Sequence, residues 1–282
     1  MIRLVVVVPV YSNWEDTVEC LRSLAAQTNP GFRVLLADDG SPSPPPAEIR
    51  QLDFVDYVRH AHSGFAGNCN RAAEEAISGG ATHLLFLNND TAFGRDFVDG
   101  WLRVAAAMPD AIVSPIIYWF GKPAKIWFSG GAQTVWLPFF RPRRNYHSIT
   151  AVDVACGCAL MATAEVWRKV RGFDARYVTY FEDLDFTLRA KRMGFRTYID
   201  PDPALRVWHK AGRSFGRIDS WNRHRRMFSS SLIFIRAHYR GPRRYLILAL
   251  KAAHLLALVA LHFPDLPNPR TLWKSVTEGL SR

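Results

Sequence analysis

Short apolar runs, each followed by a helical or turn pattern, are the feature that most restricts the fold of this chain. The first run, LVVVV at Leu4–Val8, is uninterrupted, as in strands that are covered on both faces. The series continues with Val34–Ala37, with Tyr57 and Val58, and with HLLFLN at residues 83–88. Strands separated by helices predict a parallel sheet with right-handed crossovers. We therefore expect an α/β fold.

Helix signals stand between these runs. Ser12, with Glu15 three residues later, forms a capping-box pattern and predicts a helix through Ala26. A second helix is expected from about Asn70 to the glycine pair at residues 79–80, after a loop of sequence HAHSGFAGNCN.

Three polar segments, PVYSN, DDGS and NND, directly follow predicted strands. Ligands of parallel sheets bind beyond the carboxyl ends of the strands, so a binding site is expected there. Asp38 and Asp39 can form a turn, or a carboxylate can accept the ring N–H of a pyrimidine base. GFAGNCN can be a turn before a helix, or a loop that approaches phosphate or sugar, with Asn68 and Asn70 as donors.

The segment FLNND carries a candidate metal site. Asn88, Asn89 and Asp90 can cap a helix, and they also offer oxygen ligands to Mg²⁺ or Mn²⁺. His209, in VWHKAGRSFG, is either a core histidine or a ligand of a metal or diphosphate.

The segment YFEDLDF begins an amphipathic helix that Gly194 closes. Phe181, Leu184 and Leu188 form its apolar stripe. The acids of this segment, Glu182, Asp183 and Asp185, can stabilise the helix N-terminus, or one of them can take a proton in a reaction.

Composition limits the class of protein. With 282 residues and 49% hydrophobic content, the chain can bury a sizeable core. The four cysteines are too few and too badly spaced for a disulfide framework or a four-ligand zinc site, which favours a reducing, cytosolic compartment. The short apolar start is expected to be a buried strand rather than a signal peptide.

The net charge of +11 is concentrated near the C-terminus. Between Arg206 and Arg244 there are eleven Lys and Arg residues, against one acid, Asp219. No recognised nucleic-acid motif accompanies them, so nucleic acid is not an expected partner. The apolar run Tyr245–Phe263 follows, interrupted by Lys251 and two histidines. Such a helix can lie in the interface of an anionic membrane, or it can pack on the main domain.

In their order, these segments resemble the family 2 inverting glycosyltransferases of the GT-A fold. The likeness is carried by VVVVPVYSNWEDTVECLRSL, LLADDGS, GFAGNCNRA, FLNNDT, GCALMATAEVWRKVRGFDARYVTYFEDLDFTLRAKRMGF and VWHKAGRS, from about residue 2 to residue 214. Within the family, the chain looks most like bacterial rhamnosyltransferase-like members that build O-antigens, other surface polysaccharides or cell-wall linkers. The resemblance implies a GT-A, Rossmann-like, mostly parallel sheet flanked by helices, with a C-terminal helical appendage.

The resemblance also implies residue roles on the donor side. Asn88, where the family usually has the first acid of its DXD motif, departs from the pattern and can contact ribose instead. Asp90 is the implied ligand of a Mg²⁺ or Mn²⁺ ion that bridges the diphosphate, and His209 completes that site in some members. The remaining implied donor-binding residues are Pro9, Tyr11, Asp38 and Asp39 for base and ribose, Gly67 and Asn70 in the glycine loop, and Asn89 beside the metal ligand.

On the acceptor side, the resemblance implies that Asp183 is the catalytic base, and Glu182 or Asp185 is the alternative. Direct displacement by an acceptor hydroxyl would invert the anomeric centre. Basic side chains such as Lys210 and Arg213 could assist the departing diphosphate. Gly157, Cys158 and Ala159 would lie under the acceptor, or simply pack closely; the aromatic stretch Tyr118–Phe140 could bind sugar, form a flap, or lie in the core.

We expect a catalytic domain at residues 1–215, with a donor half at 1–110 and an acceptor half at 111–215, and a basic, apolar helical region at 216–282. The expected partners are a nucleotide sugar, with dTDP-rhamnose favoured over UDP-hexose or UDP-N-acetylhexosamine, and a glycan or polyprenyl-linked glycan acceptor. The expected location is the cytoplasmic membrane face, by peripheral contact. A sugar-nucleotide pyrophosphorylase is disfavoured because the chain has no GGxGTR-like run. A catalytically inactive carbohydrate-binding protein is the non-enzyme alternative.

Overall fold

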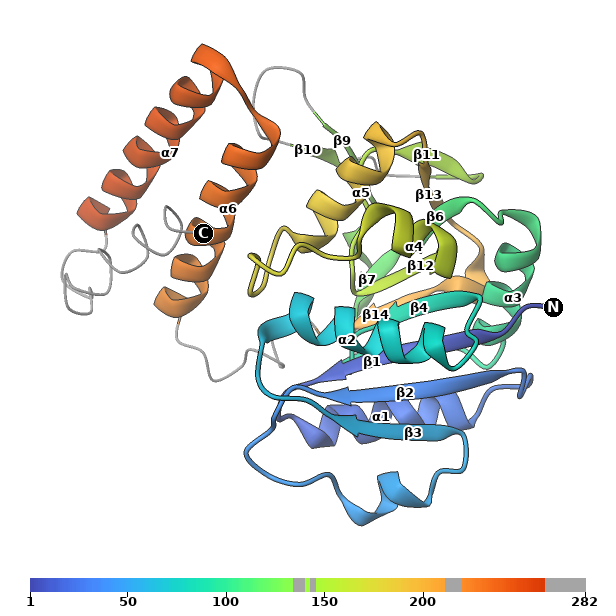
Figure 1. Cartoon of the computed structure of the whole chain (residues 1–282). Helices are drawn as coiled ribbons and strands as arrows, with labels where there is room; N and C mark the ends of the chain where they lie inside the picture. The colour runs from blue at the N-terminus through green and yellow to red at the C-terminus, as the bar shows by residue number, and fades with distance from the viewer. Residues whose placement is uncertain (134–139, 143–145, 211–219, 262–282) are drawn as a thin grey trace.

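The computed structural model describes residues 1–133, 140–142, 146–210 and 220–261. Its centre is an eight-stranded sheet with helices on both faces (Figure 1). In spatial order the strands are β11 (Thr150–Val152), β13 (Arg196–Asp200), β6 (Ala111–Pro115), β12 (Ala159–Thr163), β4 (His83–Leu87), β1 (Leu4–Val10), β2 (Phe32–Asp38) and β3 (Val55–Arg59). The predicted α/β fold is confirmed.

The sheet is parallel in its N-terminal half and mixed beyond it. Strands β4, β1, β2 and β3 pair in parallel, as the alternating pattern predicts. Strand β12 enters antiparallel between β4 and β6, while β6 and β13 are parallel and β11 is an antiparallel edge. Along β1, Val6 and Val8 face one core and Val7 faces the other. Burial on both faces explains why this run is apolar throughout.

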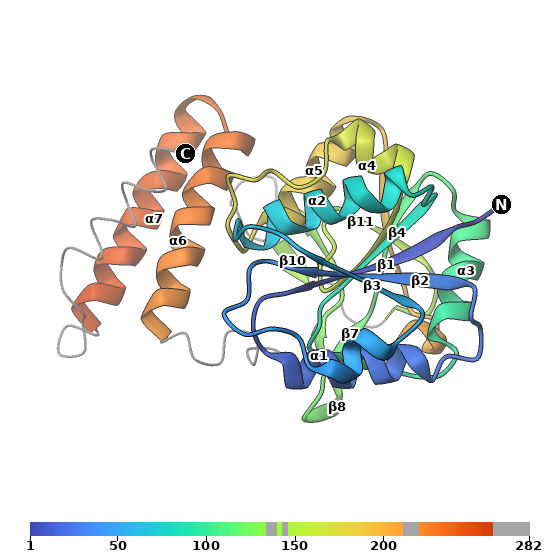
Figure 2. The same ribbon diagram turned by 60° about the horizontal axis from the view of Figure 1, so that its bottom comes forward.

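Helices cover the two faces in separate layers (Figure 2). One face is covered by α1 (Trp14–Ala25) and α3 (Phe97–Ala107). The other is covered by α2 (Gly64–Ser78), α4 (Ala164–Val170) and α5 (Glu182–Arg192). Two 3₁₀ turns, η1 (Ala47–Gln51) and η2 (Pro203–Leu205), lie in connections.

A smaller sheet brings distant segments beside the end of β4. Its strands, in spatial order, are β5 (Thr91–Phe93), β14 (Val207–His209), β7 (Ile117–Trp119) and β8 (Lys122–Phe128). In the antiparallel β14–β5 pair, His209 lies opposite Thr91, the residue after Asp90. The predicted aromatic stretch forms β7, β8 and the two-stranded ribbon of β9 (Gly131–Gln133) and β10 (Phe140–Pro142). Its residues 134–139 lie outside the described part of the chain.

The C-terminal helices α6 (Ser220–His238) and α7 (Gly241–Leu261) form a pair beside the carboxyl edge of the main sheet (Figure 1). Buried Ile233 and Phe234 of α6 pack in one cluster with the predicted apolar stripe of α5. On α7, Ile247 is buried in this cluster, while Tyr245 is 65% exposed. Within the described residues, none of the helices combines the length and apolarity needed to cross a bilayer.

Two helices begin elsewhere than predicted. Helix α1 begins at Trp14 after Asn13, and Ser12 has a positive φ of 57°, so the capping box is wrong. Helix α2 begins at Gly64, six residues before the predicted Asn70. Its first turn is fixed by Asp39, whose carboxylate accepts hydrogen bonds from the backbone N–H groups of Ser63 and Gly64 at 2.8 and 2.9 Å. That partner lies on another element, so a local pattern does not reveal it.

Candidate active site

The carboxyl ends of β1, β2 and β4 meet at one edge of the sheet and bring the predicted polar segments together. Val10, at the end of β1, pairs with Asp38 in the parallel register. The Asp39 N–H donates to the carbonyl oxygen of Val10 at 2.9 Å. Pro9 is buried in β1, and Tyr11, just after the strand, is 49% exposed. Tyr11 can therefore reach a ligand directly, whereas Pro9 can act through its backbone or by packing.

The carboxylates of the DDGS segment are both buried and bound within the protein. Asp38 accepts hydrogen bonds from the Ser41 N–H at 2.8 Å and from the Tyr57 hydroxyl at 2.7 Å. Asp39 holds the start of α2 and lies 2.8 Å from Nδ1 of His62. These acids therefore build the edge of the site. The sequence pattern alone left a turn and a base contact open, and the structure shows extensive turn-building contacts.

Two aromatic rings, those of Tyr11 and His62, form an aromatic ledge beside these carboxylates. The rings of Tyr11 and His62 lie with centroids 4.6 Å apart and tilted by 37°. The His62 side chain is 55% exposed, and Asp39 orients it. We did not predict His62 as a site residue. Its position in the loop HAHSGF, beside the DDGS strand end, was the available signal.

The candidate metal site lies at the end of β4. Nε2 of His209 is 3.0 Å from Oδ1 of Asp90, and the two side chains are 8% and 1% exposed. Among the residues that the structure describes, neither Oδ1 of Asn88 nor Nδ1 of His209 has a hydrogen-bond partner, and both atoms are buried. Trp127 packs edge-on against the imidazole, with ring centroids 4.5 Å apart. This set of carboxylate, imidazole and amide groups fits a divalent cation with further oxygen ligands from a diphosphate.

The other residues around Asp90 hold its segment in place. Asn89 is buried and donates from Nδ2 to the Thr17 hydroxyl of α1 at 2.8 Å. The Asn88 N–H donates to the Cys158 carbonyl at 2.9 Å. In the described part of the chain, no cluster of three or more His, Cys, Asp or Glu side chains suitable for a metal is found. Any metal held by Asp90 and His209 would therefore draw its other ligands from amides, water or the bound nucleotide.

Lys210, which we expected to assist the departing diphosphate, makes its side-chain contacts within the protein. Its ammonium lies 2.5 Å from Oδ1 of Asp16 and also contacts the carboxylate of Glu19, both on α1. The side chain is 2% exposed. Burial lowers the pKa of Lys210, but the hydrogen bonds to Asp16 and Glu19 and the charges of these carboxylates together raise it above its ordinary value. Lys210 therefore ties β14 to α1. Arg213, the other predicted cation, lies outside the described residues.

Asp183 occupies the first turn of α5 and is held by backbone donors. Oδ2 accepts from the Gly157 N–H and Oδ1 from the Leu184 N–H, each at 2.8 Å. The preceding residues Tyr180 and Phe181 have φ of 68° and 72°, a conformation that side chains with a Cβ rarely adopt. Partial burial raises the pKa of Asp183 above its ordinary value, although these N–H groups oppose the shift. The result is an oriented carboxylate of increased basicity.

The alternative bases have different environments. Glu182 is 7% exposed, and burial, with the charge of Asp183, keeps its pKa well above the ordinary range. Asp185 is buried and bound on both oxygens, by Nε of Arg189 at 2.6 Å and by Nε2 of His238 at 2.7 Å. Asp185 therefore fastens α6 to α5 and is not available to take a proton from an acceptor.

The small residues Gly157, Cys158 and Ala159, which lead into β12, have different environments. Gly157 supplies the N–H that holds Asp183, and a Cβ at this position would stand 3.4 Å from the Cβ of Asp183. Cys158 and Ala159 are buried in the core, so close packing accounts for them. Of the three, only Gly157 contacts the candidate base Asp183 through its backbone N–H among the described hydrogen bonds.

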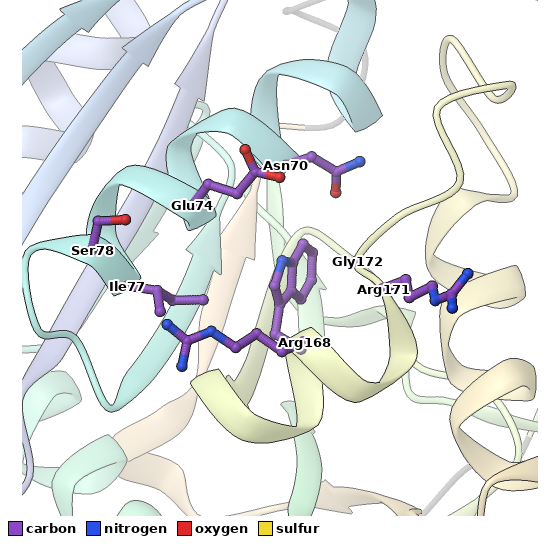
Figure 3. Close-up of a pocket in the computed structure, with 8 residues that line it drawn as sticks. Asn70, Glu74, Ile77, Ser78, Arg168, Arg171 and Gly172 are labelled. Carbon is purple, nitrogen blue, oxygen red and sulfur yellow. The ribbon is translucent and has the colours of Figure 1, made fainter.

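Asn70 and Gly67 lie within α2 rather than in a loop. The Asn70 amide both donates to and accepts from the backbone of Phe173, at 2.7 and 2.9 Å, so its contacts hold α2 to the chain before α5. Asn70 also lines a cavity of about 350 Å³ between α2 and α4, with Arg168 opposite (Figure 3). Trp167 lines the same cavity. This cavity runs toward the end of α2 at Ser78, away from the sheet edge where α2 begins.

Residues 5–167, more than half of the chain, match glycosyl transferase family 2. The chain belongs to this family. A curated relative, the N-acetylglucosaminyl-diphospho-decaprenol L-rhamnosyltransferase of Mycobacterium tuberculosis, is 27% identical over 242 residues, covering 76% of this chain and 78% of the relative. This family 2 protein is accordingly a hexosyltransferase-type enzyme that uses a nucleotide-sugar donor.

Solved structures support the fold. The mannosyltransferase PcManGT from Pyrobaculum calidifontis, solved with GDP-Man and Mn²⁺, has a TM-score of 0.61 and 16% identity, with 99% of this chain and 80% of that chain covered. The TarS 1-349 structure from S. aureus has a TM-score of 0.59 and 14% identity, with the same two coverages. Both likenesses confirm the GT-A architecture expected from the resemblance.

Proposed function

We propose that this family 2 transferase moves rhamnose from dTDP-rhamnose to a hydroxyl of a lipid-linked glycan, with inversion of the anomeric centre. The choice of rhamnose and of a lipid-linked acceptor is supported by the mycobacterial relative. The observation that carries the proposal is the position of Asp183. Its carboxylate is fixed by two backbone N–H groups at the start of α5, as an acceptor base requires.

On the donor side, the thymine base would stack on the ledge of Tyr11 and His62. The exposed ring of Tyr11 provides an apolar face, and His62 offers a polar edge for the base or ribose. Asn88, which replaces the first acid of the DXD motif, presents a buried amide oxygen that lacks a partner among the described residues. That oxygen would accept from a ribose hydroxyl or complete the cation site.

Asp90 and His209 would hold the divalent cation, and their chemistry favours Mn²⁺ over Mg²⁺ because Mg²⁺ prefers oxygen ligands alone. When bound, the cation would neutralise charge on the leaving diphosphate. The protein contributes a preformed, buried pair whose orientation is fixed by the β14–β5 pairing.

On the acceptor side, the attacking hydroxyl would donate its proton to Asp183. The carboxylate accepts one backbone hydrogen bond on each oxygen and a further one from the Cys156 thiol. A carboxylate has about four acceptor positions, so one remains for the hydroxyl. Partial burial raises the pKa of Asp183, so the carboxylate takes a proton more readily than an exposed aspartate. A single displacement by this activated hydroxyl leaves the product with the opposite anomeric configuration.

The region 216–282 would add membrane contact at the cytoplasmic face to the catalytic domain of residues 1–215. On α7, Tyr245, Leu246 and Leu250 are 65%, 58% and 50% exposed, and Arg243 and Arg244 immediately precede them. Exposed apolar side chains beside cations suit the interface of an anionic bilayer. Sedimentation of the full chain with phosphatidylglycerol vesicles, but not with phosphatidylcholine vesicles, is the expected result. Equal recovery in both supernatants would contradict it.

The test of the proposed activity is calorimetric titration of the full chain with dTDP-rhamnose, UDP-glucose and UDP-N-acetylglucosamine, each with and without Mn²⁺. Turnover with a prenyl-diphosphate N-acetylglucosamine acceptor follows, with the product's anomeric configuration read by NMR. Preferred binding of dTDP-rhamnose and an inverted product support the proposal. Preference for a UDP sugar would overturn the donor assignment, and binding of sugar without release of nucleotide diphosphate would favour the inactive carbohydrate-binding alternative.

A further inference from the structure

A basic cavity of about 200 Å³ lies between the loop before α5 and the N-terminal half of α6. Its polar lining consists of guanidinium and hydroxyl groups, without a carboxylate among the residues that line it: Arg176, Thr179, Arg225, Arg226, Ser229 and Ser230. Asp174 offsets the charge of Arg176, so the cavity's excess positive charge comes from Arg225 and Arg226 of α6, and such charge favours an anionic ligand.

The cavity is held together by contacts between its two walls. The Ser230 hydroxyl of α6 donates to the Thr179 carbonyl at 2.7 Å, and Ser230 is only 4% exposed. On the loop side, Asp174 orients the Arg176 guanidinium through a contact of 2.6 Å. The cavity is therefore formed by tertiary structure, from segments about fifty residues apart in the chain.

The cavity adjoins the candidate base. Thr179 precedes Asp183 by four residues, so their Cα atoms can be at most about 14 Å apart. The same loop also contacts the donor side, because the Phe65 N–H at the start of α2 donates to the Val178 carbonyl at 3.0 Å. A group bound between this loop and α6 therefore lies on the chain segment that leads into Asp183, close enough in sequence for a short linked sugar to span the gap.

The size and the chemistry of the cavity limit the kinds of ligand that it can bind. Pockets for whole small molecules measure roughly 300–1,000 Å³, so this cavity is too small for a nucleotide sugar. A volume of about 200 Å³ is enough for several water molecules, and so for a phosphate or diphosphate group. Guanidinium groups match phosphate oxygens with paired hydrogen bonds.

We propose that this arginine cavity binds the diphosphate of a prenyl-diphosphate-linked acceptor and thereby places the acceptor sugar at Asp183. This inference rests on the proposed function in one respect, the lipid-linked acceptor. It adds the site that distinguishes such an acceptor from a neutral glycan. The donor's diphosphate is the competing source of the same chemistry, and it belongs at Asp90 and His209 instead.

The first measurement is direct binding of inorganic diphosphate to the full chain in EDTA, where a cation-dependent donor site is silent. The test variant is Arg225→Gln with Arg226→Gln, and the control is Arg240→Gln, an exposed arginine after α6 that does not line the cavity. The double variant should bind at least about tenfold more weakly, which corresponds to about 1.4 kcal/mol. The control should match the wild type. Unchanged binding by a double variant with wild-type circular dichroism would overturn the proposal.

The second measurement compares a prenyl-diphosphate N-acetylglucosamine with octyl N-acetylglucosaminide as acceptors. The double variant should raise KM for the diphosphate acceptor alone and leave the KM for dTDP-rhamnose unchanged. An equal loss with both acceptors, or a loss confined to the donor, would overturn the assignment to the acceptor diphosphate. A wild-type enzyme that transfers sugar with no preference for the diphosphate acceptor refutes the cavity alone. If the enzyme neither binds the donor nor turns it over, the proposed function is refuted. The diphosphate titration in EDTA tests the cavity separately, because it does not depend on donor binding.

Discussion

Replacing Asp183 by asparagine separates the proposed chemistry from the contacts that hold the side chain. Both carboxylate oxygens accept backbone N–H groups at 2.8 Å, from Gly157 and from Leu184. Asparagine has one acceptor oxygen, so its NH₂ group must face one of these donors. The unsatisfied pair should lower the free energy of unfolding by about 1 kcal/mol, the low end for a lost hydrogen bond because the site is only partly buried.

The catalytic effect of Asp183→Asn should be much larger than this structural cost. Loss of a positioned base slows proton transfer by about 10²–10⁴-fold, and the change leaves the proposed donor site at Tyr11, Asp90 and His209 untouched. We therefore expect kcat to fall by that factor, with dTDP-rhamnose affinity within about threefold of wild type, a change of less than about 0.7 kcal/mol. A melting temperature only a few degrees lower would show that the variant is folded.

The assay is single-turnover transfer from radiolabelled dTDP-rhamnose, with slow donor hydrolysis as an internal control. Asp185→Asn serves as a comparison, because Asp185 is bound by Arg189 and His238 and should affect stability more than chemistry. Full transfer by a folded Asp183→Asn variant would refute the assignment of the base. Loss of hydrolysis and donor binding together would instead indicate that the change had disrupted the donor site.

Four further outcomes are expected. Glu182→Gln should raise the melting temperature relative to wild type more at about pH 8 than at about pH 4. Burial keeps the folded pKa of Glu182 well above its unfolded value, so the wild type loses stability as the pH rises above the unfolded pKa, and the neutral glutamine does not. Equal differences at both pH values would contradict this. Lys210→Met should destabilise the fold by about 3 kcal/mol in a denaturant titration, since it leaves buried carboxylate charge unpaired, yet preserve affinity for dTDP-rhamnose; a selective loss of affinity would return Lys210 to the donor site. Asp90→Ala should abolish the Mn²⁺-dependent part of donor binding measured by calorimetry, and an unchanged Mn²⁺ response would exclude Asp90 as a ligand. Gly64→Ala should unfold at least about 2 kcal/mol more easily, because Gly64 has a φ of 82° and the new Cβ would stand 2.6 Å from the Val178 carbonyl oxygen; wild-type stability would show that the loop before α5 yields freely.

The position of α6 connects the proposed acceptor site to the stability of α5. His238 of α6 and Arg189 of α5 share the buried carboxylate of Asp185, two residues after the proposed base, Asp183. The cluster of Ile233 and Phe234 with the apolar stripe of α5 adds hydrophobic contact. The C-terminal helices therefore pack on α5 and help to hold it in place.

The sequence by itself determined the features that depend on local pattern. The apolar runs predicted the parallel strands, because a strand covered on both faces must be apolar throughout. The order of the polar segments then indicated which strand ends meet, and the helix pattern placed Asp183 at a helix start. The pairing of Asp90 with His209 in one site was implied by the family resemblance. The family resemblance came from the same ordered set and is confirmed by the match over residues 5–167.

Only the tertiary structure decided which polar side chains face a ligand and which hold the protein together. Asp39 fixes the start of α2, Asn70 binds the backbone of Phe173, and Lys210 is bound by α1. Each contact joins residues that are distant in the chain, so neither periodicity nor turn chemistry could reveal it. Buried polar groups must find partners wherever the fold places them, and the partner decides whether the same residue type builds the site or binds its ligand.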